Sequence, residues 1–358
     1  MENKKEFRTW LDAMQLSHPL VIAGPCSAET EAQLHKIAQQ LKDTDATVLR
    51  AGIWKPRTRP GNFEGVGALG LQWLQDAKKA TGMLTATEVA NPSHVALALE
   101  YDVDILWLGA RTTVSPFIVQ EIAAALEGTD KIVLIKNPVN PDLALWLGAV
   151  ERIHSAGISK LGVIHRGFST YKKTGYRNNP QWQIPIDLKA AFPDLPIICD
   201  PSHIGGRRNL IFDICQTALD LQFDGLMVET HYDPEQAWSD AKQQITPATL
   251  VQYMEDLRIR NFKFNDEEIE VKMDSYRREI RSLDQQIIEM LGDRMKIADE
   301  IGALKKKKNV AILQSNVWTK TMQRMMQEGK ENGLSESFIE KMFKAIHEES
   351  IQHQKKMF

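Results

Sequence analysis

The stretch VDILWLGARTTVSPFIVQEIAAALE, residues 103–127, contains the unit from which we predict the fold. It begins with an apolar run at 103–108, passes through a short turn that contains Arg111, and ends in a segment with apolar residues at helical spacing. Such a run is typical of a buried strand, and the segment at 115–127 predicts a helix that covers it. One strand followed by one helix is the repeating unit of a parallel sheet.

The same unit recurs along roughly the first 250 residues. Seven further β-branched or Leu-rich runs lie at 19–23, 46–50, 83–87, 131–135, 160–165, 196–199 and 225–229. Helical periodicity between the runs is found at 30–42, 67–80, 141–156 and 204–221. Eight such units favour an α/β protein with a closed (β/α)8 TIM barrel over an open doubly wound sheet.

A second segment of different character follows the barrel. All 15 prolines lie at or before Pro247, and the polar stretch RIRNFKFNDEE at 258–268 lacks a strong apolar period. From Ile269 the apolar residues step by three, four or seven over about 36 residues, which predicts one long amphipathic helix. Two more helical stretches, at about 315–330 and 335–354, complete a three-helix unit. We therefore divide the chain into a barrel at 1–258, a linker at 259–268 and an all-α domain at 269–358.

The composition is that of a globular protein, with 358 residues, 43% of them hydrophobic and 25% charged. The formal net charge of −3 provides no global positive field, which argues against nucleic acid or an anionic membrane as partner. No apolar run is long enough to span a bilayer, and no signal peptide opens the chain. Three cysteines cannot all pair, so we expect a cytoplasmic protein that acts on small molecules.

Polar side chains gather where the predicted strands end. In a barrel these ends and the loops after them form one active-site face, so residues far apart in sequence are expected to converge there. The basic members of the set, which would bind phosphate and carboxylate groups if they converge, are Arg50, Lys55, Arg57, Arg111, Lys136 and Arg166. Any one of them taken alone is better explained as a solvated loop charge, and it is their repetition at strand ends that favours a binding site.

Four further residues have the donor chemistry of a metal site. Cys26, His203, Glu229 and Asp240 offer a thiolate, an imidazole and two carboxylates, a mixture suited to Mn²⁺, Fe²⁺, Co²⁺ or Zn²⁺. Their spacing matches no local metal motif, and a lone cysteine is usually a small buried apolar residue. Both interpretations stay open at this point.

Nine segments resemble type I DAHP synthase, the first enzyme of the shikimate pathway, and they occur in that family's order. The resemblance runs from about Pro19 to Thr246 and rests on GPCSAE (24–29), RAGIWKPRT (50–58), GAR (109–111), IKN (135–137), HRG (165–167), DPSH (200–203), GRR (206–208), MVETH (227–231) and SDAKQQ (239–244). It implies condensation of phosphoenolpyruvate with erythrose 4-phosphate to 3-deoxy-D-arabino-heptulosonate 7-phosphate and inorganic phosphate. It also implies one divalent metal ion.

Residue roles follow from the same resemblance. The implied metal ligands are Cys26, His203, Glu229 and Asp240, and Lys55 resembles the family lysine that holds phosphoenolpyruvate and donates a proton. The implied clamp on phosphoenolpyruvate is Arg50, Arg111, Lys136 and Arg166, and the loop that meets erythrose 4-phosphate is Pro56, Arg57 and Thr58. The sequence Tyr-Arg-Asn-Asn-Pro at 176–180 departs from the commonest pattern of this family. The competing barrel is 3-deoxy-D-manno-octulosonate 8-phosphate synthase, against which KPRT at 55–58 argues.

The three-helix segment resembles chorismate mutase of the AroQ type, through residues 273–305 and through EESIQHQ at 348–354. The resemblance implies rearrangement of chorismate to prephenate by a domain-exchanged homodimer, in which Arg277 enters the partner's site. The other implied site residues are Arg294, Lys305, Ser350 and Gln354, with Lys305 as the main donor to the ether oxygen. At three positions where the family usually has Asp, Arg and Glu, this chain has Gln314, Val317 and Trp318.

These resemblances lead to the expectation of a bifunctional enzyme that dimerises through its C-terminal domain, alone or within a higher oligomer. Prephenate or chorismate bound at the C-terminal domain would also regulate the barrel. Two alternatives are a mutase-like domain that serves only for effector binding and dimerisation, and a metabolite-sensing protein without turnover.

Overall fold

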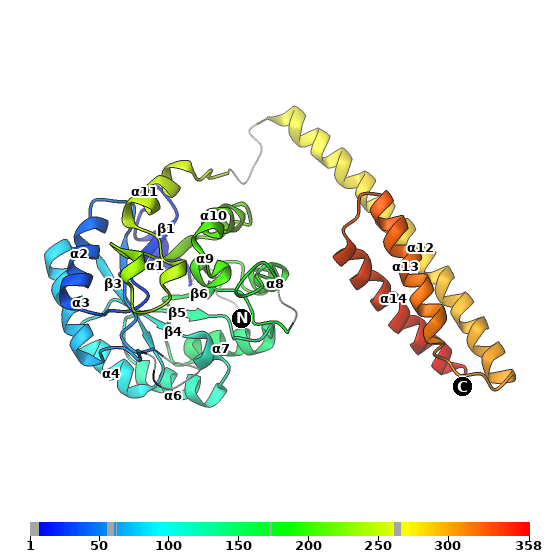
Figure 1. Cartoon of the computed structure of the whole chain (residues 1–358), viewed down its shortest axis with the longest axis horizontal. Coiled ribbons are helices and arrows are strands. Elements are labelled where there is room, and N and C mark those ends of the chain that lie inside the picture. The colour runs from blue at the N-terminus through cyan, green and yellow to red at the C-terminus, as the bar shows by residue number, and fades with distance from the viewer. Residues whose placement is uncertain (1–6, 56–60, 62, 172–173, 261–265) are drawn as a thin grey trace. The chain divides into compact units, whose positions relative to one another are not determined.

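The computed structural model describes residues 7–55, 61, 63–171, 174–260 and 266–358, and the chain divides into two compact units at 1–260 and 261–358 (Figure 1). Within the described ranges, no helix is long and apolar enough to cross a membrane.

The first unit is the predicted eight-stranded barrel. Every strand pairs in parallel with the next, and β1 pairs with β8, so the sheet is closed. In the last pairing Gly24 lies opposite Glu229, which brings the two ends of the sheet together. The strands are β1 (Leu20–Gly24), β2 (Val48–Arg50), β3 (Leu84–Val89), β4 (Ile105–Leu108), β5 (Ile132–Lys136), β6 (Leu161–His165), β7 (Ile197–Cys199) and β8 (Gly225–Glu229).

Helices between the strands form the outer layer. Six helices of the barrel begin at a side chain that accepts a hydrogen bond from the first turn: Thr30, Asn91, Ser115, Asp142, Asp200 and Thr246. The larger helices are α2 (Glu31–Leu41), α3 (Ala68–Thr81), α4 (Pro92–Glu100), α6 (Pro116–Leu126), α7 (Leu143–Ser155), α8 (Gln183–Ala191), α10 (Ile211–Asp220) and α11 (Pro247–Asp256). Short helices are α1 (Thr9–Asp12), α5 (Ala110–Thr113) and α9 (Pro201–Gly205), with 3-10 turns at Arg208–Leu210, Pro234–Gln236 and Ala241–Gln243.

The predicted helix at 204–221 is wrong as a single element. The chain forms α9, a 3-10 turn and α10 there, because Gly206 takes a left-handed conformation (φ +67°) that ends α9. The break has a function in the fold, since the short α9 begins one residue after β7 and carries His203 at the strand ends.

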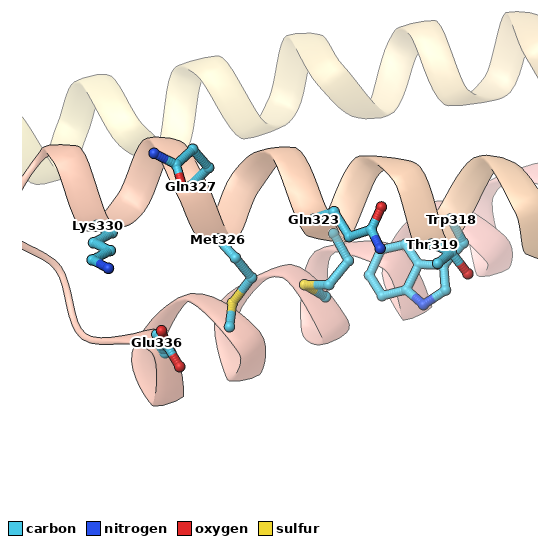
Figure 2. A pocket seen from close by; sticks show the side chains of 8 residues that line it. Trp318, Thr319, Gln323, Met326, Gln327, Lys330 and Glu336 are labelled. Atoms are coloured by element: carbon cyan, nitrogen blue, oxygen red, sulfur yellow. The ribbon is translucent and has the colours of Figure 1, made fainter.

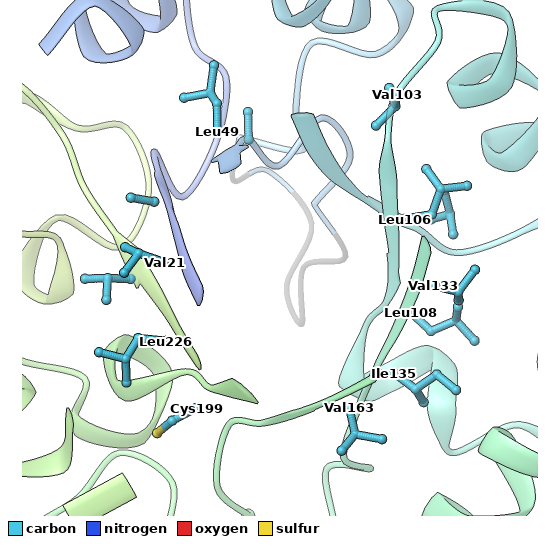
Figure 3. Close-up of a cluster of buried hydrophobic side chains, with 14 of the residues drawn as sticks. Val21, Leu49, Val103, Leu106, Leu108, Val133, Ile135, Val163, Cys199 and Leu226 are labelled. Carbon is cyan, nitrogen blue, oxygen red and sulfur yellow. The ribbon is translucent and has the colours of Figure 1, made fainter. Parts of the chain in front are cut away.

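Two cores result from the alternation of side chains along each strand. Outward-facing residues such as Val21, Leu106 and Val163 pack under the helices, as Figure 3 shows for the ring of strands. Inward-facing residues such as Ile22, Trp107 and Met227 fill the barrel itself.

The second unit has the three predicted helices, α12 (Glu267–Lys307), α13 (Ser315–Glu331) and α14 (Glu336–Lys356). Asp266 caps α12, whose first residue, Glu267, falls within the predicted linker. The helix packs against α14 around Gly302, where an added Cβ would lie 2.9 Å from Gln354 Cα. Much of the apolar face of α12 is exposed, including Ile280, Leu283 and Ile287.

Candidate active site

The carboxyl ends of the barrel strands bring the predicted polar residues to one face. Cys26 lies two residues after β1, Arg50 and Lys136 end β2 and β5, and Glu229 ends β8. His203 is on α9, which starts directly after the loop residue that follows β7. This convergence is the consequence of a closed parallel barrel.

Cys26 is fully buried and lies between two polar side chains. Its Sγ is 2.8 Å from Lys55 Nζ and 3.2 Å from Asp240 Oδ2, although 214 residues separate it from Asp240. The backbone N–H of Cys26 donates to Gln244 Oε1 at 3.0 Å, which fixes the loop after β1. The thiol is thus held against an ammonium group and a carboxylate at once.

His203 and Glu229 form the second pair of candidate ligands. His203 Nε2 lies 3.8 Å from Glu229 Oε1, and His203 Nδ1 lies 2.8 Å from Asp200 Oδ2, so Asp200 fixes the orientation of the ring. Glu229 Oε2 accepts a hydrogen bond from Gln243 Nε2 at 2.6 Å. Glu229 Oε1 is buried and accepts no hydrogen bond from the residues that the structure covers.

The four predicted ligands therefore form two close pairs. Among the described side chains no three of the His, Cys, Asp and Glu type are grouped tightly enough to enclose a metal ion. Even so, the buried oxygen of Glu229 without a donor, together with a thiol, an imidazole and a second carboxylate, has the ligand chemistry of a borderline divalent ion. The donor set fits such an ion.

Burial and charge compete in determining the pKa values of these groups. Burial raises the pKa of Cys26 to about 12, with Glu229 adding to the effect and Lys55 opposing it. Burial works against ionisation of Glu229, but the attraction of His203, Arg50 and Lys55 lowers its pKa. For Lys55, burial is outweighed by Cys26, Glu229 and Asp240, so its pKa is raised and it stays an ammonium ion at neutral pH.

Arg50 presents unpaired donors inside the barrel mouth. Its side chain is 2% exposed, and Nε and Nη1 are buried without a hydrogen-bond partner in the described ranges. One remaining nitrogen, Nη2, lies 3.4 Å from Glu229 Oε1, and the guanidinium lies 4.9 Å from the centre of the Trp107 ring. Two unpaired guanidinium N–H groups form a ready site for one planar or tetrahedral anion.

Lys136 and Arg166 share this basic face. Lys136 Nζ pairs with Asp200 Oδ2 at 2.9 Å. Burial lowers the pKa of Arg166 to about 10, with Asp200 opposing the effect and the charges of Arg177 and Arg111 adding to it. An anion bound among Arg166, Arg177 and Arg111 would stabilise these three cations. The predicted Pro56, Arg57 and Thr58 lie outside the described residues.

Two residues at the face, Arg177 and Asp200, have roles that the sequence did not predict. Arg177, within the segment that departs from the family pattern, pairs with Asp240 at 3.0 Å and also donates to Gln243. Asp240 itself is in the left-handed conformation (φ +48°), which turns its carboxylate toward Cys26. Asp200 orients His203, and only its position in the DPSH motif, next to the histidine, signalled that role.

Hydrogen bonds join the loop at 238–244 to the loop after β1. Ser27 Oγ and Ser239 Oγ are 2.6 Å apart, and the backbone N–H of Trp238 donates to Glu29 Oε1 at 2.8 Å. Because Cys26 is on one loop and Asp240 on the other, these contacts set the distance between the two candidate ligands.

In the C-terminal unit, α12 and α14 bring four of the five predicted residues together. Arg294 donates to Ser350, and Lys305 Nζ donates to Gln354 Oε1 at 3.0 Å and to the carbonyl of Ile312 at 2.5 Å. Arg277 pairs with Asp274 and lies about 25 Å along α12 from Arg294, at 1.5 Å per residue. A single chain thus contains a four-residue cluster without Arg277.

The three departures from the mutase pattern lie at the start of α13. Gln314 and Val317 are exposed. Trp318 stacks on His347 of α14, with ring centroids 3.9 Å apart and an angle of 12° between the planes. Figure 2 shows Trp318 at one end of a groove that is lined by α13 side chains such as Met326 and by Glu336 at the start of α14.

Comparison with known proteins agrees with this division into two parts. Residues 15–260 match the model of the DAHP synthetase I family, and residues 276–355 match that of chorismate mutase type II. The chain therefore belongs to the DAHP synthetase I family. It continues into a domain of the chorismate mutase type II family.

Individual relatives match the barrel. Phospho-2-dehydro-3-deoxyheptonate aldolase of Thermotoga maritima is 34% identical over 225 residues, which cover 63% of this chain and 64% of that protein. A 2-dehydro-3-deoxyphosphooctonate aldolase of Syntrophotalea carbinolica is 29% identical over 258 residues, covering 64% of this chain and 86% of that protein. A crystal structure of the T. maritima DAHP synthase superposes with a TM-score of 0.61 at 32% identity, covering 67% of this chain and 68% of that one.

Proposed function

We propose that the barrel is a DAHP synthase, which joins phosphoenolpyruvate to erythrose 4-phosphate and releases inorganic phosphate. The observation that carries this proposal is the contact of Cys26 with both Lys55 and Asp240 at the strand ends. Beside it, the unpaired nitrogens of Arg50 provide the anion site that a phosphorylated substrate requires.

Each residue has a defined part in the reaction. Arg50, Arg111, Lys136 and Arg166 bind the phosphate and carboxylate of phosphoenolpyruvate and hold its methylene carbon toward the aldehyde carbon. As the new carbon–carbon bond forms, the aldehyde oxygen gains negative charge and takes a proton from the ammonium group of Lys55. Water then adds to the cationic carbon of the former enol phosphate, and the carbon–oxygen bond to phosphate breaks.

Cys26, His203, Glu229 and Asp240 would hold a divalent metal ion. Bound there, the ion supplies Lewis acidity at the aldehyde oxygen. Asp200 orients the imidazole of His203, and the joined loops at 26–29 and 238–244 keep Cys26 near Asp240.

A phosphate-release assay with added Mn²⁺ tests the barrel proposal. We expect the wild type to release phosphate from phosphoenolpyruvate when erythrose 4-phosphate is present. A chelator should abolish this reaction, and the Cys26→Ser variant should not catalyse it. Cys215→Ala, which changes a cysteine buried on α10, is the matched control and should stay active. A separate calorimetric titration should show that Cys26→Ser binds Mn²⁺ more weakly than the wild type does.

The competing function is that of an octulosonate 8-phosphate synthase, because the Syntrophotalea carbinolica relative is a 2-dehydro-3-deoxyphosphooctonate aldolase. An eight-carbon product needs a five-carbon aldehyde, since phosphoenolpyruvate supplies three carbons, so arabinose 5-phosphate is the diagnostic substrate. Phosphate release with that sugar alone would overturn the proposal in favour of the competitor. No release with either sugar would favour a metabolite-sensing protein.

We further propose that the C-terminal domain converts chorismate to prephenate. The paired contacts of Arg294 with Ser350 and of Lys305 with Gln354 support this, because they gather two cations that can hold a dicarboxylate in folded form. Lys305 would donate to the ether oxygen as that bond breaks. Loss of chorismate absorbance measures the activity, and Lys305→Ala should abolish it. Prephenate binding without any chorismate turnover would favour a domain that serves only as an effector receptor.

Dimerisation and feedback complete the proposal. The exposed apolar residues of α12, Ile280, Leu283 and Ile287, support a homodimer formed through this domain. In such a dimer Arg277 would reach the partner's site. Prephenate or chorismate bound at the domain would then change the activity of the barrel, provided that it binds one arrangement of the protein more tightly.

A further inference from the structure

His347 lies on the same face of α14 as the two mutase residues of that helix. Residues 347, 350 and 354 are spaced by three and four, so their side chains line one stripe. Ser350 and Gln354 use this stripe to contact Arg294 and Lys305 of α12. His347 therefore extends the cluster by one helical turn toward the start of α14.

The imidazole of His347 is held in place by stacking, but one of its ring nitrogens has no hydrogen-bond partner among the described residues. Its ring stacks on Trp318 of α13, 3.9 Å between centroids, which fixes the plane of the ring. Its Nε2 is buried, and in the part of the chain that the structure covers it has no hydrogen-bond partner. Buried polar atoms of this kind are normally paired, so an unpaired one beside a ligand cluster indicates a place for a ligand atom.

Charge around the ring also favours an anionic ligand. Burial lowers the pKa of His347, and Arg294 and Lys305 lower it further, while Glu348 opposes them. The ring is consequently neutral at neutral pH and can donate one hydrogen bond and accept another. A dicarboxylate between the two cations would relieve their mutual repulsion and offer the ring an acceptor.

We propose that His347 is a ligand-binding residue of the C-terminal site, with Nε2 hydrogen-bonded to the dicarboxylate that Arg294 and Lys305 hold and with Trp318 fixing the ring. Trp318 cannot make the contact of the acidic residue usual at its position, and His347 supplies a polar contact from the neighbouring helix. This inference rests on the proposed binding of chorismate and prephenate by the domain.

Calorimetric titration of the full chain with prephenate tests the proposal, together with the Michaelis constant for chorismate. His347→Phe keeps an aromatic ring on Trp318 but removes the hydrogen bond, and it should weaken prephenate binding by about tenfold. His347→Gln restores a donor at the same reach and should recover most of that loss. His353→Phe changes a histidine of α14 that pairs with Asp299 and should bind as the wild type does.

The outcomes separate the inference from the function beneath it. Wild-type protein that neither binds prephenate nor converts chorismate overturns both. If the wild type binds, Arg294→Ala does not, and His347→Phe binds with unchanged affinity, the inference alone is wrong. Helix content and thermal unfolding measured on each variant identify a loss of folding, and in that case the comparison of His347→Gln with the wild type decides.

Discussion

Arg50 is a buried cation, and the described residues provide hydrogen-bond acceptors for only part of its guanidinium group. Glu229 lies near one nitrogen, and Trp107 covers one face of the guanidinium, but Nε and Nη1 remain unpaired among the described residues. A buried unpaired donor is costly, so the conformation is stabilised when an anion enters. Substrate binding and local stability are therefore coupled at this residue.

Arg50→Lys tests that coupling, because lysine keeps the charge but loses the planar fork. We expect the Michaelis constant for phosphoenolpyruvate to rise by about tenfold or more, since bidentate contact to the anion is lost. Arg152→Lys is the control, on the outer helix α7, where the side chain donates a hydrogen bond to Gln120. Equal constants for the two variants would show that Arg50 does not bind the substrate anion.

His165 makes stability depend on pH. Burial and, to a smaller extent, the charge of Arg166 lower its pKa to about 3. Its ring lies among Trp182, Phe168 and Phe223, with centroids 5.2–6.0 Å away. Between about pH 3 and 6.5 the unfolded chain binds a proton at this position and the folded chain does not, so stability is fully present above 6.5 and falls as the pH falls.

His165→Phe should remove that dependence. The wild type should lose up to about 1.4 kcal/mol per pH unit below 6.5 from this residue, and the variant should lose less over the same range. Urea unfolding at pH 7.0, 6.0 and 5.0 measures both slopes. Parallel slopes would mean that the folded and unfolded chains bind the same number of protons at His165, and that burial does not lower its pKa.

At the scale of elements, α12 contains two glycines in opposite surroundings. A Cβ added at Gly302 would lie 2.9 Å from Gln354 Cα and 3.1 Å from its carbonyl oxygen, whereas one added at Gly292 meets nothing within 4 Å. The first glycine allows α12 and α14 to approach, and the second only loosens the helix. The pair separates packing from helix propensity within one element.

Gly302→Ala should separate the two helices, pull Gln354 away from Lys305 and abolish chorismate turnover. Gly292→Ala should instead stabilise the helix by up to about 1 kcal/mol and preserve turnover. Thermal unfolding and the chorismate assay on both variants give the comparison. A fully active Gly302→Ala would disprove the close approach.

The elements also separate what the sequence predicts from what it does not. Apolar runs located all eight strands, since a strand buried on both faces is apolar along most of its length. The break at Gly206 was missed because a positive φ leaves no trace in an apolar period. The contacts of Arg177 with Asp240 and of Trp318 with His347 were missed as well, because loop paths and side-chain partners depend on tertiary packing.

A glycine motif in the sequence also shows that spacing alone does not establish a binding site. Gly65, Gly67 and Gly70 have the G-x-G-x-x-G spacing typical of dinucleotide sites, yet β2 ends 15 residues before Gly65. The fingerprint requires a strand directly before the first glycine. Here Gly65 instead lets its backbone approach the carbonyl of Ile53, which an added Cβ would meet at 2.1 Å.

For the whole molecule, the apolar face of α12 predicts association. Replacing Ile280 and Leu283 together by Glu places two charges on this exposed apolar stripe, and we expect a dimer to become a monomer. Sedimentation equilibrium measures the change. Arg277 would lose its partner site in that monomer, so chorismate turnover should fall too, while the barrel reaction persists. A wild-type chain that sediments as a monomer would contradict the proposed dimer.

Removing all residues after Arg258 tests the proposed feedback. The shortened barrel should still release phosphate from its two substrates but should no longer respond to prephenate, because the effector site is gone. The rate of phosphate release with and without prephenate, in both chains, is the measurement. Persistent sensitivity in the shortened chain would place the effector on the barrel.

Pairing of the first strand with the last has a consequence for synthesis on the ribosome. Cys26 is translated about 200 residues before its companions Glu229 and Asp240, and the register that joins Gly24 to Glu229 forms only when β8 has emerged. A nascent chain therefore cannot assemble the candidate catalytic centre piecemeal. The Cys26 thiol gains the two carboxylates only late, when β8 closes the ring.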